Sequence, residues 1–130
     1  MTVTKPSNTV LTMLLSQQPP FVPEGVEAMT VRIDLPPGDP GSPPHRHSGP
    51  VFGYMLEGEM IFELEGEPER VIRAGEAFWE PGGDVIHYQA ANNLADRWSR
   101  FVVVMLSRRD RKCSSTWTTR NWSSGGTGGR

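Results

Sequence analysis

The sequence PPHRHSGPVFGYMLEGEMIFELE, residues 43–65, contains two strand-like segments joined by a tight turn. In its second segment, EMIFELE (59–65), every second residue is apolar, which places Met60, Phe62 and Leu64 on one face. The first segment, VFGYML, is mostly apolar, and the EG pair that follows it is typical of a turn. The stretch therefore predicts a β-hairpin with one buried face.

Segments of the same kind lie on both sides of this hairpin. In EAMTVRIDL (27–35), apolar residues again occupy every second position. The segment FVVVML (101–106) is continuously apolar, which is typical of a strand that is covered on both sides. Nowhere does a helical i, i+3, i+4 spacing extend beyond a turn or two. Short strands separated by turns every 8–12 residues or so predict an all-β fold, and specifically an antiparallel barrel.

Charge and composition divide the chain into a body and a tail. Residues 1–106 carry 7 Lys and Arg against 14 Asp and Glu, whereas residues 107–130 carry 6 against one. The second segment has no Leu, Ile, Val, Phe, Met or Ala, so it cannot bury enough apolar area to offset the entropy lost on ordering. We expect an N-terminal arm over residues 1–24, a barrel over residues 25–106 and a disordered basic tail over residues 107–130.

The composition also limits the class of protein. The 13 Lys and Arg nearly balance the 15 Asp and Glu, whereas a nucleic-acid-binding domain is strongly basic. No segment has the ~18 consecutive apolar residues of a membrane span. The run VLTMLL (10–15) is shorter than the core of a signal peptide, and no small-residue cleavage site follows it. We therefore expect a cytoplasmic protein that binds a small molecule and neither nucleic acid nor membranes.

The chain has three histidines, His45, His47 and His87. His45 and His47 are two residues apart, so on an extended chain both side chains project to the same side. His87 begins another expected strand. If these strands are neighbours in the barrel, the three imidazoles can hold one metal ion and leave coordination positions open for a substrate. The alternative is a solvated His-x-His pair in a loop that binds no metal.

Two segments of the sequence resemble the two conserved motifs of the cupin superfamily. His45 and His47 match the His-x-His of the first motif, and Gly58 matches its closing glycine. In AGEAFWEPGGDVIH (74–87), the residues that match the second motif are Gly75, Pro81, Gly83 and His87. The resemblance covers about residues 25–106. It implies a cupin-type barrel, also called a double-stranded β-helix or jelly roll, with the three histidines as metal ligands.

One departure from the first motif affects the expected metal site. Val51 stands where the family has a glutamate ligand, so the resemblance implies three neutral imidazoles, similar to three-histidine cupin dioxygenases. This resemblance implies Fe(II) as the favoured metal, and a three-histidine set also suits Zn, Mn, Cu or Ni. Gln89, two residues beyond His87, is expected to face the same interior as a catalytic residue, either as an oxygen ligand or by orienting substrate. The alternative role for Gln89 is that of a hydrogen-bonded interior amide. Glu57 and Glu80 are expected to be turn or surface carboxylates.

Strand alternation predicts an apolar substrate pocket lined by Val51, Met55 and Phe62. Such a pocket suits an aromatic or polyketide-like molecule better than a sugar or a dicarboxylate. The resemblance to small single-domain cupins of fungal secondary-metabolite pathways implies a metal-dependent tailoring oxidoreductase, dioxygenase-like if the metal is iron. The alternative is a non-redox cupin, either a module that binds or senses a small molecule, or an isomerase or cyclase that uses the metal as a Lewis acid.

The same alternation predicts outward-facing aromatic side chains at Phe52, Tyr54, Trp79 and Tyr88. Aromatic residues are enriched in the cores of protein interfaces. We therefore expect the chain to form a homodimer through this outer face.

Overall fold

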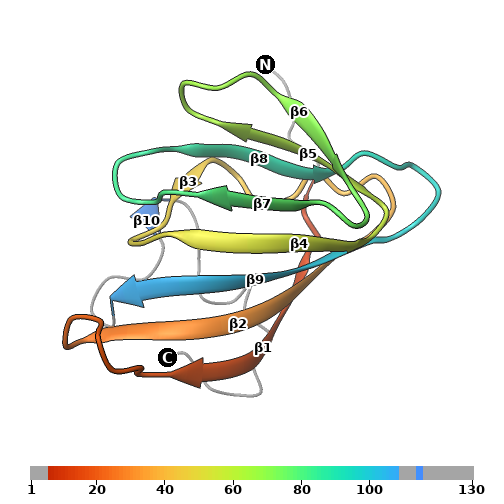
Figure 1. The fold of residues 1–130 in the computed structure, drawn as a ribbon. Helices are drawn as coiled ribbons and strands as arrows, with labels where there is room; N and C mark the ends of the chain where they lie inside the picture. Colours follow the sequence, from red (N-terminus) through yellow and green to blue (C-terminus); the bar gives the residue numbers. More distant parts are fainter. Residues whose placement is uncertain (1–5, 109–113, 116–130) are drawn as a thin grey trace.

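The computed structural model describes residues 6–108 and 114–115. Within them, ten strands form two antiparallel sheets, a first sheet ordered β1-β2-β9-β4-β7 and a second sheet ordered β10-β3-β8-β5-β6 (Figure 1). The strands are β1 (Val10–Gln17), β2 (Val26–Leu35), β3 (His45–Arg46), β4 (Val51–Glu57), β5 (Glu59–Leu64), β6 (Arg70–Arg73), β7 (Ala77–Glu80), β8 (His87–Asn92), β9 (Ser99–Arg108) and β10 (Ser114–Ser115). The predicted all-β, antiparallel fold is thus confirmed. Among the described residues, no helix has the length and hydrophobicity needed to cross a membrane.

The strands β2 and β9 form the centre of the first sheet. They pair over ten residues without a register shift, from Val26 opposite Arg108 to Leu35 opposite Ser99. Their inward side chains, such as Val31 and Val103, are buried against the second sheet, where Met60, Phe62 and Leu64 of β5 form the opposite wall, as the alternation predicts. The hydrophobic core therefore lies between the two sheets.

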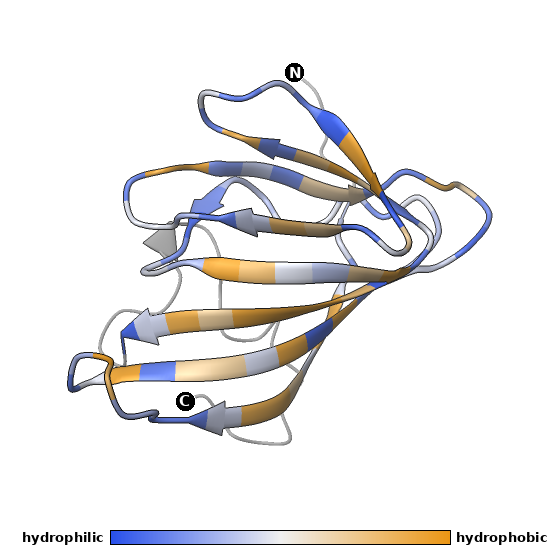
Figure 2. Cartoon of the chain, in the orientation of Figure 1, coloured by the Kyte–Doolittle hydropathy of each residue, from blue (hydrophilic) through white to orange (hydrophobic). Residues whose placement is uncertain are grey.

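The continuously apolar strand β9 is buried on one face only, although its sequence predicts cover on both. Phe101, Val103 and Met105 point into the core, whereas Val104 is 40% exposed. Figure 2 shows β9 as a largely hydrophobic strand between β2 and β4. The strands β2 and β4 on either side pair with the backbone of β9, but no layer of the described residues covers its outer side. Of the outer apolar side chains, Val104 is therefore exposed to solvent, and Val102 and Leu106 are half-buried.

Strand β1 lies within residues 1–24, which the sequence analysis assigns to an N-terminal arm. It pairs antiparallel with β2, from Val10 opposite Asp34 to Gln17 opposite Ala28. Leu11 is buried in the core, and a register shift around Leu14 interrupts the alternation. Residues 10–17 therefore add an edge strand to the first sheet. The predicted disordered tail, residues 107–130, lies largely outside the described residues, although Ser107 and Arg108 end β9.

The loop after β2 fixes the beginning of β1. The buried carboxylate of Asp39 accepts hydrogen bonds from the backbone N–H of Asn8 at 2.6 Å and from Thr9 Oγ1 at 2.6 Å. It also accepts hydrogen bonds from Ser7 Oγ at 3.0 Å and from the backbone N–H of Gly41 at 2.9 Å. One buried carboxylate thus ties the N-terminal segment to a loop about thirty residues away in the sequence.

Candidate metal centre

Two short elements of the second sheet position the three histidines. Strand β3 pairs with β8 at a single position, where His45 lies opposite His87. His47 follows β3 directly, and its backbone carbonyl accepts a hydrogen bond from the N–H of Gly83 at 2.7 Å. The glycine-rich loop after β7 therefore holds the His47 segment in place.

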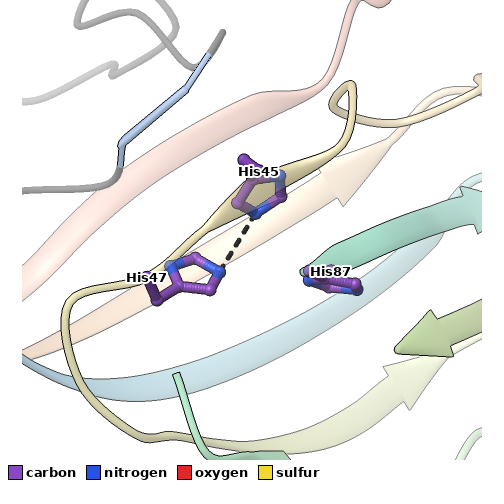
Figure 3. Close-up of side chains that lie close together, drawn as sticks. All are labelled: His45, His47 and His87. Atoms are coloured by element: carbon purple, nitrogen blue, oxygen red, sulfur yellow. Dashed lines mark hydrogen bonds between the residues drawn. The ribbon is translucent and has the colours of Figure 1, made fainter. Parts of the chain in front are cut away.

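The three imidazole rings face a common space (Figure 3). Each residue offers one nitrogen, and these nitrogens all lie within 4.8 Å of one another. The Nε2 atoms of His45 and His47 are 3.0 Å apart. All three side chains are buried. The structure thus brings together the three histidines that the spacing predicts, in a geometry that could hold one metal ion.

Backbone carbonyls fix the ring nitrogens that are available for a metal. His45 Nδ1 lies 2.7 Å from the carbonyl oxygen of Pro43, and because a carbonyl only accepts, Nδ1 carries the proton and Nε2 presents a lone pair. In neutral His87, Nε2 donates in the same way to the Gln89 carbonyl at 3.0 Å, which leaves a lone pair on Nδ1. His87 Nδ1 is buried without a hydrogen-bond partner. In this structure the lone pair on His45 Nε2 accepts a hydrogen bond from His47 Nε2. A divalent cation that displaces this proton fits the space that the three rings face.

A fourth residue of the site, Glu80 at the end of β7, is buried, although the sequence analysis expects a surface or turn carboxylate. Its Oε2 atom lies 3.1 Å from His87 Nδ1, without the alignment of a hydrogen bond, and 3.7 Å from His47 Nε2. The signal that could have found it is alternation, because Phe78 and Glu80 share one face of β7 while Trp79 faces outward. Glu57, in contrast, is exposed and pairs with Arg100, as expected for a turn carboxylate.

Burial determines the protonation of this cluster. Desolvation lowers the pKa of His47 from its ordinary 6.5 to about 4 and also lowers the pKa of His45. Burial acts to raise the pKa of Glu80, but the contact with His87 and the attraction of the imidazoles in their protonated forms outweigh it and lower that pKa. At neutral pH the cluster therefore holds His45 and His47 as neutral imidazoles beside a carboxylate, which are the forms that bind metal ions.

The histidines and Glu80 lie at one wall of a mostly apolar cavity between the two sheets. The other lining residues are Thr9, Leu11, Ile33, Leu35, Ser42, Val51, Met60, Phe62, Phe78, Ala90, Phe101, Val103 and Met105. None of these described lining residues is Lys or Arg. The cavity has a volume of about 40 Å³, which is room for about three water molecules.

Of the three predicted pocket residues, two line the cavity and one lies in the core. Val51 and Phe62 line the cavity, as the alternation predicts. Met55 is fully buried in the core and is not among the residues that line this cavity. Met55 lies four residues along β4 from Val51, which is roughly 13 Å in an extended strand, and it packs in the core away from the histidines.

Gln89 does not reach the site, contrary to the expectation that it faces the same interior as His87. Its side-chain amide donates to Glu63 Oε1 and to Glu69 Oε1, both at 2.9 Å. The reason is a bulge, because Leu64 pairs with His87 but Glu63 pairs with Gln89, which leaves Tyr88 unmatched. The bulge reverses the alternation, so Ala90 lines the cavity in place of Gln89.

Comparison with known proteins agrees with this architecture. The family model described as "Cupin domain" matches residues 31–104. An oxalate oxidase in complex with the substrate analogue glycolate is similar, with a TM-score of 0.63 and 26% identity over 86% of this chain and 57% of that chain. KdgF from Halomonas sp. has a TM-score of 0.51 and 28% identity over 68% of this chain and 86% of that chain.

A third similar structure is an RmlC-like cupin family protein with a double-stranded β-helix fold from Methanocaldococcus jannaschii. Its TM-score is 0.58, with 19% identity over 83% of this chain and 88% of that chain. The present chain spans only 57% of the length of the oxalate oxidase. No curated protein matched the sequence. The match of the family model over more than half of the chain, together with the two antiparallel sheets, shows that this chain belongs to the cupin domain family.

Proposed function

We propose that this chain is a metal-dependent cupin enzyme, an oxidoreductase with Fe(II) as the favoured metal, that acts on a small and mostly apolar molecule. The observation that carries the proposal is the convergence of His45, His47 and His87 in a buried cavity lined largely by apolar side chains. The similarity to an oxidase of the same fold at 26% identity supports an oxidoreductase. The proposed substrate is an aromatic or polyketide-type metabolite, because the chain resembles small fungal cupins that act on such molecules.

The residues of the chain perform two tasks in this proposal. The imidazoles of His45, His47 and His87 hold the metal, and the carbonyls of Pro43 and Gln89 keep two of the rings in the metal-binding tautomer. A bound Fe(II) supplies Lewis acidity and one-electron redox chemistry. The apolar wall of the cavity excludes water from the reacting atoms.

The cavity limits the substrate in two ways. With no Lys or Arg among its described lining residues, it offers no protein cation to an anionic group, so a neutral molecule fits better than a dicarboxylate. Its volume of about 40 Å³ accommodates only a few atoms beside a metal. An aromatic substrate therefore requires part of the wall to move, and both edge strands of the first sheet contribute to this wall, β1 with Leu11 and β7 with Phe78.

The metal site is tested by elemental analysis of the purified protein and of the variant His87→Ala. We expect close to one transition-metal ion per chain, and loss of most of this metal in the variant. Circular dichroism shows whether the barrel remains folded, and Gln89→Ala is the matched control on the same strand. A protein that binds no metal after incubation with Fe(II) contradicts the proposal.

The redox class is tested by oxygen consumption in the Fe(II)-loaded protein with small phenols and aldehydes as candidate substrates. Substrate-dependent oxygen uptake that is absent in His87→Ala supports an oxidoreductase. Turnover without oxygen or another electron acceptor would instead indicate an isomerase or cyclase. Tight binding of a candidate without turnover would indicate a binding or sensing module.

A further inference from the structure

We infer that Glu80 is the fourth protein ligand of the metal, and that it replaces, from the neighbouring strand, the carboxylate that the first motif lacks at Val51. This inference rests on the proposed metal site and assigns it one more residue. It changes the donor set from three neutral nitrogens to three nitrogens and one anionic oxygen.

The first support is the position of Glu80 relative to Val51. The two residues lie directly opposite each other in the pairing of β4 with β7. Directly opposite residues of a sheet point to the same face with their Cβ atoms about 5 Å apart. Both side chains are buried and both line the cavity. A carboxylate at either position therefore enters the cavity from the same wall.

The second support is the distance from Glu80 to the imidazole nitrogens. Its Oε2 atom lies 3.1 Å from His87 Nδ1 and 3.7 Å from His47 Nε2. His87 Nδ1 is buried and has no hydrogen-bond partner. A carboxylate oxygen and imidazole nitrogens that converge at these distances can bind one metal ion together.

The third support is the absence of another partner that explains the burial of Glu80. Among the described residues, the only ion pairs recorded for Glu80 are with His47 and His87. A carboxylate that is 3% exposed is costly without a counter-charge. When the imidazoles are in the neutral form that binds metal ions, a bound cation supplies the positive charge that this carboxylate needs. A carboxylate ligand also shifts the preference of the site towards Fe(II) and Mn(II) relative to Cu(II).

The test uses Co(II), whose visible absorption reports on the atoms bound to it. The full chain, Glu80→Gln, Glu80→Gln/Val51→Glu and the control Glu57→Gln are stripped with a chelator and titrated with Co(II). We expect Glu80→Gln to lose at least 10-fold to 100-fold in affinity, because even partners that only support the ligands contribute about that much. Its absorption spectrum should also change. The added carboxylate at position 51 should restore most of the affinity, and Glu57→Gln should behave as the unsubstituted chain.

The outcomes separate this inference from the proposed function. No Co(II) binding by the unsubstituted chain would overturn the metal site as a whole. Binding by Glu80→Gln with unchanged affinity, or with an unchanged spectrum, would overturn only the role of Glu80 as a ligand. Failure of Val51→Glu to restore affinity would overturn the equivalence of the two positions. If Glu80→Gln does not fold, Glu80→Asp serves instead, because its carboxylate is withdrawn by one methylene and the spectrum must change if the oxygen is bound.

Discussion

The bulge at Tyr88 determines which side chains of β8 face the cavity. Before it, His87 faces inward, and after it Ala90 and not Gln89 lines the cavity. The amide of Gln89 instead bridges Glu63 and Glu69. This bridge links two like-charged carboxylates through a shared donor in a partly exposed position, so it contributes to stability and not to the metal site.

The variant Gln89→Ala should therefore separate stability from metal binding. We expect unchanged metal content and affinity, because the Gln89 side-chain amide donates to Glu63 and Glu69, and the backbone carbonyl that holds His87 is kept in the variant. The loss of two hydrogen bonds should lower the free energy of unfolding by roughly 1–2 kcal/mol, measured by urea denaturation of the metal-free protein. A loss of metal in this variant would restore Gln89 as a candidate ligand.

The histidines could be predicted from sequence because their geometry is local. On an extended segment, spacing by two places His45 and His47 on one side, whatever the rest of the fold. Glu80 and Gln89 depend on features that are not local. The bulge in β8 arises from its pairing with β5, and the burial of Glu80 depends on the pairing of β7 with β4. The alternation of residues within one strand does not show how that strand pairs with its neighbours. In β7, however, the apolar residue Phe78 lies on the same face as Glu80 and indicates that Glu80 points inward.

At the level of secondary-structure elements, the N-terminal segment is part of the cavity wall. Thr9 and Leu11 line the cavity, and Asp39 holds the residues just before β1 through hydrogen bonds. This region is predicted from the sequence to be an arm, because the bulge around Leu14 hides the alternation of the strand. The strands with uninterrupted alternation, such as β2 and β5, could be predicted closely.

The variant Asp39→Ala should loosen this edge of the first sheet. The donors of Asn8, Thr9 and Gly41 lose their acceptor, and we expect a loss of about 2–3 kcal/mol in the free energy of unfolding. Hydrogen exchange of residues 10–17 should accelerate more than that of β9. The exposed acid Asp96 provides a control, because Asp96→Ala should change neither. Equal exchange in β1 of Asp39→Ala and the original chain would contradict the role of this carboxylate.

At the level of the whole molecule, the outer face of the first sheet carries a continuous apolar patch. Its first row, across three neighbouring strands, is formed by Trp79, Phe52 and Val104. The second row contains Tyr54, and the rings of Phe52 and Trp79 stack at 6.1 Å. Tyr88 belongs to the second sheet and lies outside this patch. The homodimer proposed from the sequence would thus use the first sheet alone.

We predict that two copies of the chain associate face to face through this patch, related by a two-fold axis. The double variant Phe52→Ser/Trp79→Ser should be monomeric in analytical ultracentrifugation, because it removes the two stacked rings. Tyr88→Ser, on the other sheet, should leave the dimer intact. A monomeric unsubstituted chain at tens of micromolar would contradict the prediction.

The four groups of the proposed metal centre come from both sheets of the barrel. Glu80 ends a strand of the first sheet, whereas His45 and His87 belong to the second. The separation of the two sheets therefore sets the distance between the Glu80 carboxylate and the histidine nitrogens. Because packed interiors transmit small volume changes, a core substitution far from the histidines would alter this span. The choice of metal would then depend on the thickness of the core as well as on the ligands.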